Sequence, residues 1–144
     1  EHADVAPTLL SCCGIDAPAE MEGMNLVPWM RGARADAARD AVVSLECTWQ
    51  MKWCIRTDSR KFILSREPDF YGTPQRELYD LRADPDELNN IADREPESVR
   101  ELETRLETWV RHGMARNGLD RDPLVAHGLT LGKAWKEVYP PGTL

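Results

Sequence analysis

Residues 77–93 read ELYDLRADPDELNNIAD, and this stretch decides the fold because a short apolar strand runs directly into a turn. Its second half carries the signals of a helix start. Asp84 stands where an N-cap is expected, Pro85 occupies the first helical position, and Glu87 follows three residues after the cap. The pattern predicts a strand, a sharp stop and a short helix.

One set of residues in this stretch forms a motif: Glu77, Leu78, Tyr79, Asp80, Leu81, Asp84, Pro85, Glu87 and Asn90. The motif closely resembles a signature near the C-terminus of sulfatases, members of the alkaline-phosphatase superfamily. Similar pieces lie at residues 4–28, 56–62 and 122–132. The resemblance covers nearly the whole chain but corresponds only to the last part of a sulfatase.

Length and charge narrow the class of protein. A chain of 144 residues can bury one sizeable core. The net charge of −7 is spread over interleaved acidic and basic residues, so no basic face is expected for nucleic acid. No run has the length of a membrane span or the pattern of a signal peptide. The chain begins at Glu1, in what reads as mid-sequence, so the compartment, cytoplasmic or periplasmic, stays open.

The fold class that the sequence predicts is α+β. Short apolar alternations between turns over residues 41–81 predict a four-stranded antiparallel meander. A two-residue loop at Asp58 and Ser59 would pair Ile55 with Phe62 and Trp53 with Leu64, all on one face. Cys54 then points to the other face, which disfavours a disulfide with Cys47.

A long helix is predicted to open at Pro96 and to cover one face of the sheet. Its apolar stripe comprises Val99, Leu102, Leu106, Trp109 and Val110. Glu101 and Glu107 are spaced for ion pairs with Arg105 and Arg111, and Asn117 with Gly118 forms a stop. An irregular tail is expected afterwards.

Residues 1–40 read as a separate piece. Asp4 is a plausible N-cap for a short helix that presents Leu9 and Leu10 and ends at Gly14. The resemblance implies that residues 1–40 are the end of a sulfatase catalytic α/β domain and that 41–144 form the C-terminal subdomain. Without the rest of the catalytic domain, the apolar face of this helix is expected to be exposed, disordered or in a homo-oligomer contact.

The resemblance implies a formylglycine nucleophile, made from the Cys or Ser of a C/S-x-P-S-R motif, and a divalent metal, calcium or magnesium, in the full-length parent. All four cysteines lack the following Pro and Arg, and no cysteine or histidine has zinc-ligand spacing. Asp80, Asp84 and Asp86 lack the glycine and terminal glutamate of a calcium loop. We therefore assign no catalytic residue, metal ligand or cofactor to this chain.

Two side chains are candidates for substrate contact. Trp49, at the tip of the first hairpin, could stack on a sugar. His112, near the C-terminal end of the long helix, sits where positive charge is favoured.

The functional hypothesis is a non-catalytic C-terminal domain of a sulfatase-like hydrolase, which completes the active-site cleft and stabilises the catalytic domain. Two alternatives remain: a stand-alone binding or assembly module with this fold, or part of a phosphonate or phosphodiester hydrolase.

Overall fold

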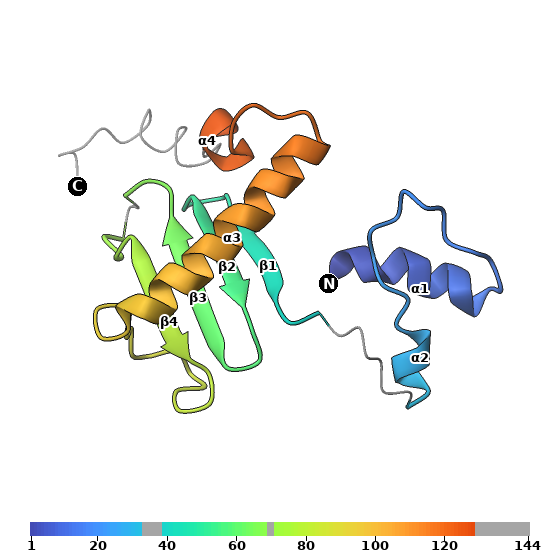
Figure 1. Cartoon of the computed structure of the whole chain (residues 1–144), viewed down its shortest axis with the longest axis horizontal. Coiled ribbons are helices and arrows are strands. Elements are labelled where there is room, and N and C mark those ends of the chain that lie inside the picture. Colours follow the sequence, from blue (N-terminus) through green and yellow to red (C-terminus); the bar gives the residue numbers. More distant parts are fainter. Residues whose placement is uncertain (33–38, 69–70, 129–144) are drawn as a thin grey trace. The chain divides into compact units, whose positions relative to one another are not determined.

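The structure is a computed structural model that describes residues 1–32, 39–68 and 71–128. It divides into two compact units, Glu1–Asp40 and Ala41–Leu144 (Figure 1). The elements of the first unit are η1 (His2–Asp4), α1 (Val5–Cys12) and α2 (Val27–Met30). Those of the second are β1 (Val42–Glu46), β2 (Lys52–Arg56), β3 (Arg60–Ser65), β4 (Arg76–Asp80), α3 (Pro96–Arg116) and α4 (Pro123–His127). No helix within the described ranges is long and apolar enough to cross a membrane.

The first unit is tied together by the buried carboxylate of Asp4, which is only 2% exposed. Its Oδ1 accepts the Met24 N–H at 2.7 Å, and its Oδ2 accepts a hydrogen bond from Arg39 Nη1 at 2.7 Å. Asp4 does stand at the N-cap position of α1, but its side chain makes no capping bond. The predicted capping role was therefore wrong, because more distant partners take both carboxylate oxygens. Position 23 requires a glycine, because a Cβ there would lie 1.9 Å from the Ala3 carbonyl oxygen. This close approach of the two backbone segments also holds the unit together.

Acid should loosen this first unit through Asp4. The Arg39 guanidinium and the Met24 amide help to hold the pKa of the Asp4 carboxyl well below its usual range. Its stabilising contribution is thus present above the unfolded-state pKa of about 4 and is lost as the pH falls further, toward the depressed folded value. The protection factor of the Met24 amide, which is the exchange rate of the unfolded chain at the same pH divided by the observed rate, should fall below about pH 4. Asp4→Asn should remove most of that dependence, whereas Asp16→Asn, a change at an exposed aspartate, should preserve it.

The sheet of the second unit has the strand order β1-β2-β3-β4, with every neighbouring pair antiparallel. Ile55 pairs with Phe62 and Trp53 with Leu64, so the predicted register of the central hairpin is confirmed. Cys54 occupies an alternate position in β2 and forms no disulfide with Cys47, as expected. All four cysteines are free thiols, but the expectation that they are buried is wrong, because Cys12, Cys13 and Cys47 are exposed.

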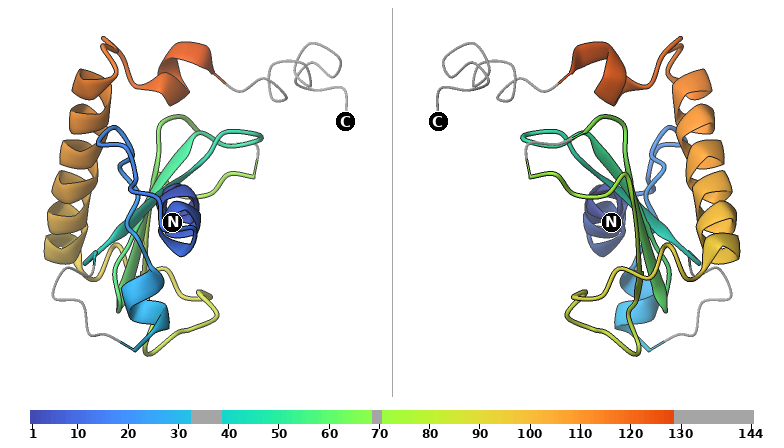
Figure 2. Two further views of the ribbon diagram at one scale, coloured as in Figure 1. Left: turned by 90° about the vertical axis from the view of Figure 1, so that its right-hand side faces the viewer. Right: turned by 90° about the vertical axis from the view of Figure 1, so that its left-hand side faces the viewer.

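Helix α3 covers one face of the sheet, as Figure 2 shows with the strands nearly edge-on. The α+β prediction is thereby confirmed. Period-2 alternation in the strands and period-3.6 recurrence in the helix bring their apolar side chains to one layer. The core comprises Met51, Trp53, Ile55, Phe62, Leu64, Leu78, Val99, Leu102, Leu106, Val110 and Leu124. Trp109 is an exception to the predicted stripe: it is 47% exposed and packs edge-on against Trp53, with ring centroids 6.0 Å apart.

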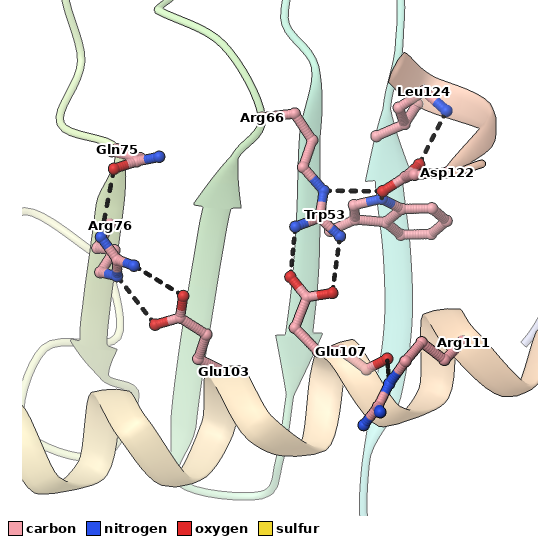
Figure 3. Close-up of polar contacts among 9 residues, drawn as sticks. All are labelled: Trp53, Arg66, Gln75, Arg76, Glu103, Glu107, Arg111, Asp122 and Leu124. Atoms are coloured by element: carbon pink, nitrogen blue, oxygen red, sulfur yellow. Dashed lines mark hydrogen bonds and ion pairs between the residues drawn. The ribbon is translucent and has the colours of Figure 1, made fainter. Parts of the chain in front are cut away.

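Ion pairs fix α3 and α4 to the sheet (Figure 3). The Arg66 guanidinium donates to both carboxylate oxygens of Glu107, and its Nε donates to Asp122 Oδ2 at 2.8 Å. Trp53 Nε1 donates to the same Asp122 oxygen at 2.9 Å. The predicted Glu107–Arg111 ion pair is wrong, because Arg66 occupies the Glu107 carboxylate and Arg111 Nε donates to the Glu107 backbone carbonyl instead.

Asp122 is the junction of these contacts, because its Oδ1 also accepts the Leu124 N–H and so caps α4. Asp122→Ala should lower the free energy of unfolding by about 2 kcal/mol, since it removes a helix cap and leaves buried donors unsatisfied. Urea unfolding followed by tryptophan fluorescence would measure this loss. Asp120→Ala, two residues earlier at an exposed position, is the matched control and should leave the midpoint unchanged.

The predicted helix after Asp84 is absent: residues 81–95 form turns and irregular structure. The Asp84 carboxylate accepts the backbone N–H groups of Leu88 and Asn89. Glu87 has a φ of 57°, in the left-handed region, so the backbone cannot continue as a helix there. Asp84 therefore does satisfy backbone donors, but in a turn rather than at a helix start.

This loop returns to cover the outer edge of β4. Asn90 Oδ1 accepts the Leu78 N–H at 2.9 Å, and Asn90 Nδ2 donates to the Arg76 carbonyl at 3.2 Å. The Ile91 N–H donates to the Leu78 carbonyl at 2.9 Å. The loop thus stands in for a fifth strand at this edge. The tail after Gly118 was expected to be irregular, which is wrong for residues 123–127 because they form the short helix α4; residues 129–144 of the expected tail lie outside the described residues.

Candidate functional site

A hollow of about 430 Å³ lies on the sheet face opposite α3. Alternation along the strands brings polar side chains to this face at the positions between the core residues. The polar and ionisable residues that line the hollow include Lys52, Cys54, Lys61, Glu77, Tyr79 and Glu87. Ile63 contributes to its apolar lining.

A buried ion pair forms the base of the hollow. Lys52 Nζ lies 2.8 Å from Glu77 Oε1 and also donates to Thr73 Oγ1 at 2.6 Å. The Tyr79 hydroxyl donates to the other Glu77 oxygen at 2.7 Å. Burial and the neighbouring Glu77 carboxylate raise the pKa of Tyr79, so this hydroxyl remains a protonated donor. The signature residues Glu77 and Tyr79 thus hold one another and Lys52 in place.

The other ionisable side chains described in the hollow are also held in ion pairs or in their neutral form. Lys61 donates to the Glu87 carboxylate. Burial raises the pKa of the Cys54 thiol, which keeps it in the neutral form that is a poor nucleophile and metal ligand. Within the described ranges, no three His, Cys, Asp or Glu side chains are grouped to hold a metal ion. The residues present therefore do not fit the metal and formylglycine chemistry of a sulfatase centre.

The turn that follows β1 presents Trp49 beside this hollow. Glu46 Oε1 accepts the backbone N–H groups of Thr48 and Trp49, at 2.8 and 3.1 Å. These amides lower the pKa of Glu46, so the carboxylate that orders the turn stays ionised. The Trp49 side chain is 41% exposed, while Glu46 and Gln50 on either side of the turn line the hollow. The turn is therefore ordered independently of any ligand.

The second candidate, His112, lies exposed near the end of α3. Because α3 covers the opposite face of the sheet, the structure does not bring His112 to the hollow. Lys52, Lys61 and Thr73 were missed as members of the hollow. For the two lysines the signal was available, since the register that places Cys54 on this face places Lys52 and Lys61 there too.

Comparisons with known proteins point to one family. The family model described as N-sulphoglucosamine sulphohydrolase, C-terminal, matches residues 1–112. Arylsulfatase K of Xenopus laevis is 29% identical over 118 residues, and a delta 4,5-hexuronate-2-O-sulfatase of Bacteroides thetaiotaomicron is 33% identical over 94 residues. These matches cover 74% and 62% of this chain but only 21% and 18% of the relatives, so the chain spans about a fifth of their length.

Solved structures of sulfatases and of a related hydrolase contain the same fold. A 2-O GAG sulfatase superposes with a TM-score of 0.64 at 27% identity, over 79% of this chain and 26% of that one. A phosphonate monoester hydrolase of Agrobacterium radiobacter, 23% identical, shares the fold with a TM-score of 0.55 over 73% of this chain and 23% of its own. The family match extends over more than half of the chain. The chain therefore belongs to the family of N-sulphoglucosamine sulphohydrolase C-terminal regions, within the sulfatases of the alkaline-phosphatase superfamily.

Proposed function

We propose that this chain is the non-catalytic C-terminal part of a sulfatase that hydrolyses sulfuric esters. The observation that carries the proposal is the family match over residues 1–112, in a chain that spans about a fifth of its relatives. The contacts of the hollow support it, because Lys52 and Lys61 are held by carboxylates and burial raises the pKa of the Cys54 thiol. The metal, calcium or magnesium, and the formylglycine would belong to the catalytic domain of the parent.

The two units would then have different roles. Residues 1–40 would be the end of the catalytic α/β domain, and residues 41–144 the C-terminal subdomain that stabilises it. The exposed side chains of Val5 and Leu9 on α1, 50% and 61% accessible, support this assignment. Apolar groups on one side of a helix are typical of a surface that packs against another part of the protein.

The turn around Trp49 would contribute to the substrate cleft. Its ordered backbone and half-exposed indole suit stacking on a sugar ring, since an aromatic face provides apolar contact at little entropic cost. Two of the similar proteins are, by name, sulfatases of a hexuronate and of a GAG, which supports a sulfated glycan as substrate. His112 remains the weaker candidate, because it projects from α3 on the other side of the sheet.

The parent gene product provides the test. Its intact mass should exceed the 16.4 kDa of this chain, and a peptide map should contain a C/S-x-P-S-R peptide. The parent, supplied with calcium or magnesium, should hydrolyse an aryl sulfate, whereas the present chain should not. Preference for a phosphonate monoester would instead indicate a phosphonate hydrolase. A native product with a mass of 16.4 kDa would indicate a stand-alone binding or assembly module.

Trp49→Ala in the parent should raise KM for a sulfated disaccharide about tenfold while kcat changes little, because a stacking contact contributes about 1–3 kcal/mol of mainly uniform binding. Trp109→Ala is the matched control, since Trp109 is similarly exposed but lies on α3. Equal effects of the two substitutions on KM would contradict a substrate contact at Trp49.

A further inference from the structure

The two edge strands of the sheet, β1 and β4, differ in the hydrogen-bond partners of their outward backbone groups. At β4 the loop of residues 81–95 occupies the outward backbone groups through Asn90 and Ile91. At β1, the backbone hydrogen bonds among the described residues run to β2 on one side of the strand only. An uncovered edge strand is a template for pairing with another strand.

The hydrogen-bonding register identifies the backbone groups that β1 presents. The Thr57 N–H donates to the Arg60 carbonyl and the Arg66 N–H to the Met51 carbonyl, both at 2.8 Å, so odd-numbered residues of β2 bond to β3. Antiparallel ladders alternate, and even-numbered residues of β2 therefore bond to β1. Since Ser44 pairs with Cys54, the N–H and C=O groups of Val43 and Leu45 point away from the sheet. The same alternation predicts outward groups at Leu78 in β4, where the structure shows them bonded to Asn90 and Ile91.

Strand β1 lacks the features that normally prevent edge pairing. It has no proline or lysine, and its five residues pair with β2 without a bulge. Val42 and Leu45 are 41% and 47% exposed, so among the described residues this edge presents accessible apolar side chains.

We propose that β1 pairs antiparallel with β1 of a second copy of this chain, about a two-fold axis at Ser44. In this register Val43 faces Leu45 of the partner subunit, and the outward N–H and C=O groups of both residues bond across the axis. Ser44 faces its own copy as a pair without hydrogen bonds. Glu46 faces Val42 of the partner subunit, so the two carboxylates lie at opposite ends of the ladder.

The apolar residues of β1 are complementary to the same residues of a second copy, which favours a second copy as the partner. Val43 and Leu45 lie on the α3 face of the sheet, where they pair with Ile55 and Trp53. Trp109, half-exposed, extends that apolar surface from the helix. A two-fold axis perpendicular to the sheet keeps this face common to both copies, so apolar side chains meet apolar side chains. Any other register of β1 against a second β1 would lose either the contact between apolar side chains or some of the hydrogen bonds between the two strands.

Disulfide trapping tests the register. In the full chain with its four native cysteines changed to serine, Ser44→Cys should give a covalent dimer under mild oxidation. Its Cα atoms would be about 4.5 Å apart across the axis, within disulfide range. Val42→Cys, in the same strand but opposite Glu46, is the matched control and should stay largely monomeric. Equal trapping of both variants, or none, would overturn the proposed register.

Oligomeric state tests the surface independently. Light scattering of the chain should give twice the 16.4 kDa mass at high concentration. Leu45→Lys should shift the monomer–dimer midpoint at least tenfold upward in concentration, with the circular dichroism spectrum unchanged. Leu9→Lys, on α1, should leave the midpoint unaltered. A dimer that Leu9→Lys disperses and Leu45→Lys does not would place the contact on α1 and overturn the proposal, as would a monomer at every concentration.

Discussion

Replacing Lys52 with methionine is expected to lower the free energy of unfolding of the sheet unit by about 3 kcal/mol, because a buried carboxylate then loses its cation. The Lys52 and Glu77 side chains are only 9% and 11% exposed, and their polar atoms lie 2.8 Å apart. Without Lys52, Glu77 retains only the Tyr79 hydroxyl among its described partners in the hollow. Urea unfolding followed by tryptophan fluorescence would measure the loss.

The control for Lys52 is an exposed ion pair. Arg100 lies 3.7 Å from Glu97, with side chains 71% and 92% exposed, and Arg100→Met should cost less than about 0.5 kcal/mol. The double variant Lys52→Met with Glu77→Leu should recover part of the stability, since replacing a buried pair with apolar groups is often nearly neutral. If Lys52→Met costs no more than Arg100→Met, the pair is not the structural support described above.

Leu106→Ala should destabilise the same unit by about 3 kcal/mol, because it removes buried methyl groups and leaves a cavity between α3 and the sheet. Leu106 is fully buried and belongs to the core cluster that contains Phe62 and Leu78. Thermal unfolding monitored by circular dichroism would show a lowered melting temperature.

Leu88→Ala provides the same chemical change at a residue that is 79% exposed, and it should shift stability by less than about 0.5 kcal/mol. Comparable losses from both leucine variants would contradict packing as the cause and indicate an effect on the unfolded state.

The sheet and its helix could be predicted from sequence because their information is local and periodic. Alternation fixed the partners of Trp53 and Ile55, since a slip of one residue would turn every apolar side chain to the wrong face. Helix α3 followed equally from a 3.6-residue stripe that opens at Pro96.

The errors arose where a short polar side chain found a distant partner. Asp4 and Asp84 both carried the local signature of an N-cap. Asp4 instead binds Arg39, and the chain after Asp84 turns so that Asn90 can reach β4. Glu107 likewise binds Arg66 rather than the arginine one helical turn away. Sequence spacing shows which local bonds are possible but not which distant donors compete for the same oxygen.

The candidate site was harder to predict than the fold. Trp49 could be placed at a hairpin tip, but its support by Glu46 depends on turn geometry that no motif specifies. The register places Lys52 on the same face as Cys54, but an isolated lysine in a strand gives no sign that its head group will be buried against Glu77 and Thr73.

The amide of Asn90 also determines how far strand pairing between copies can extend. With both edges of a sheet open, each added copy would offer a fresh edge to the next, and assembly would have no natural end. Because Asn90 and Ile91 occupy the backbone groups of β4, a copy joined through β1 presents only a closed edge to solvent. Asn90 and Ile91 together would thereby limit strand pairing between copies to a finite pair.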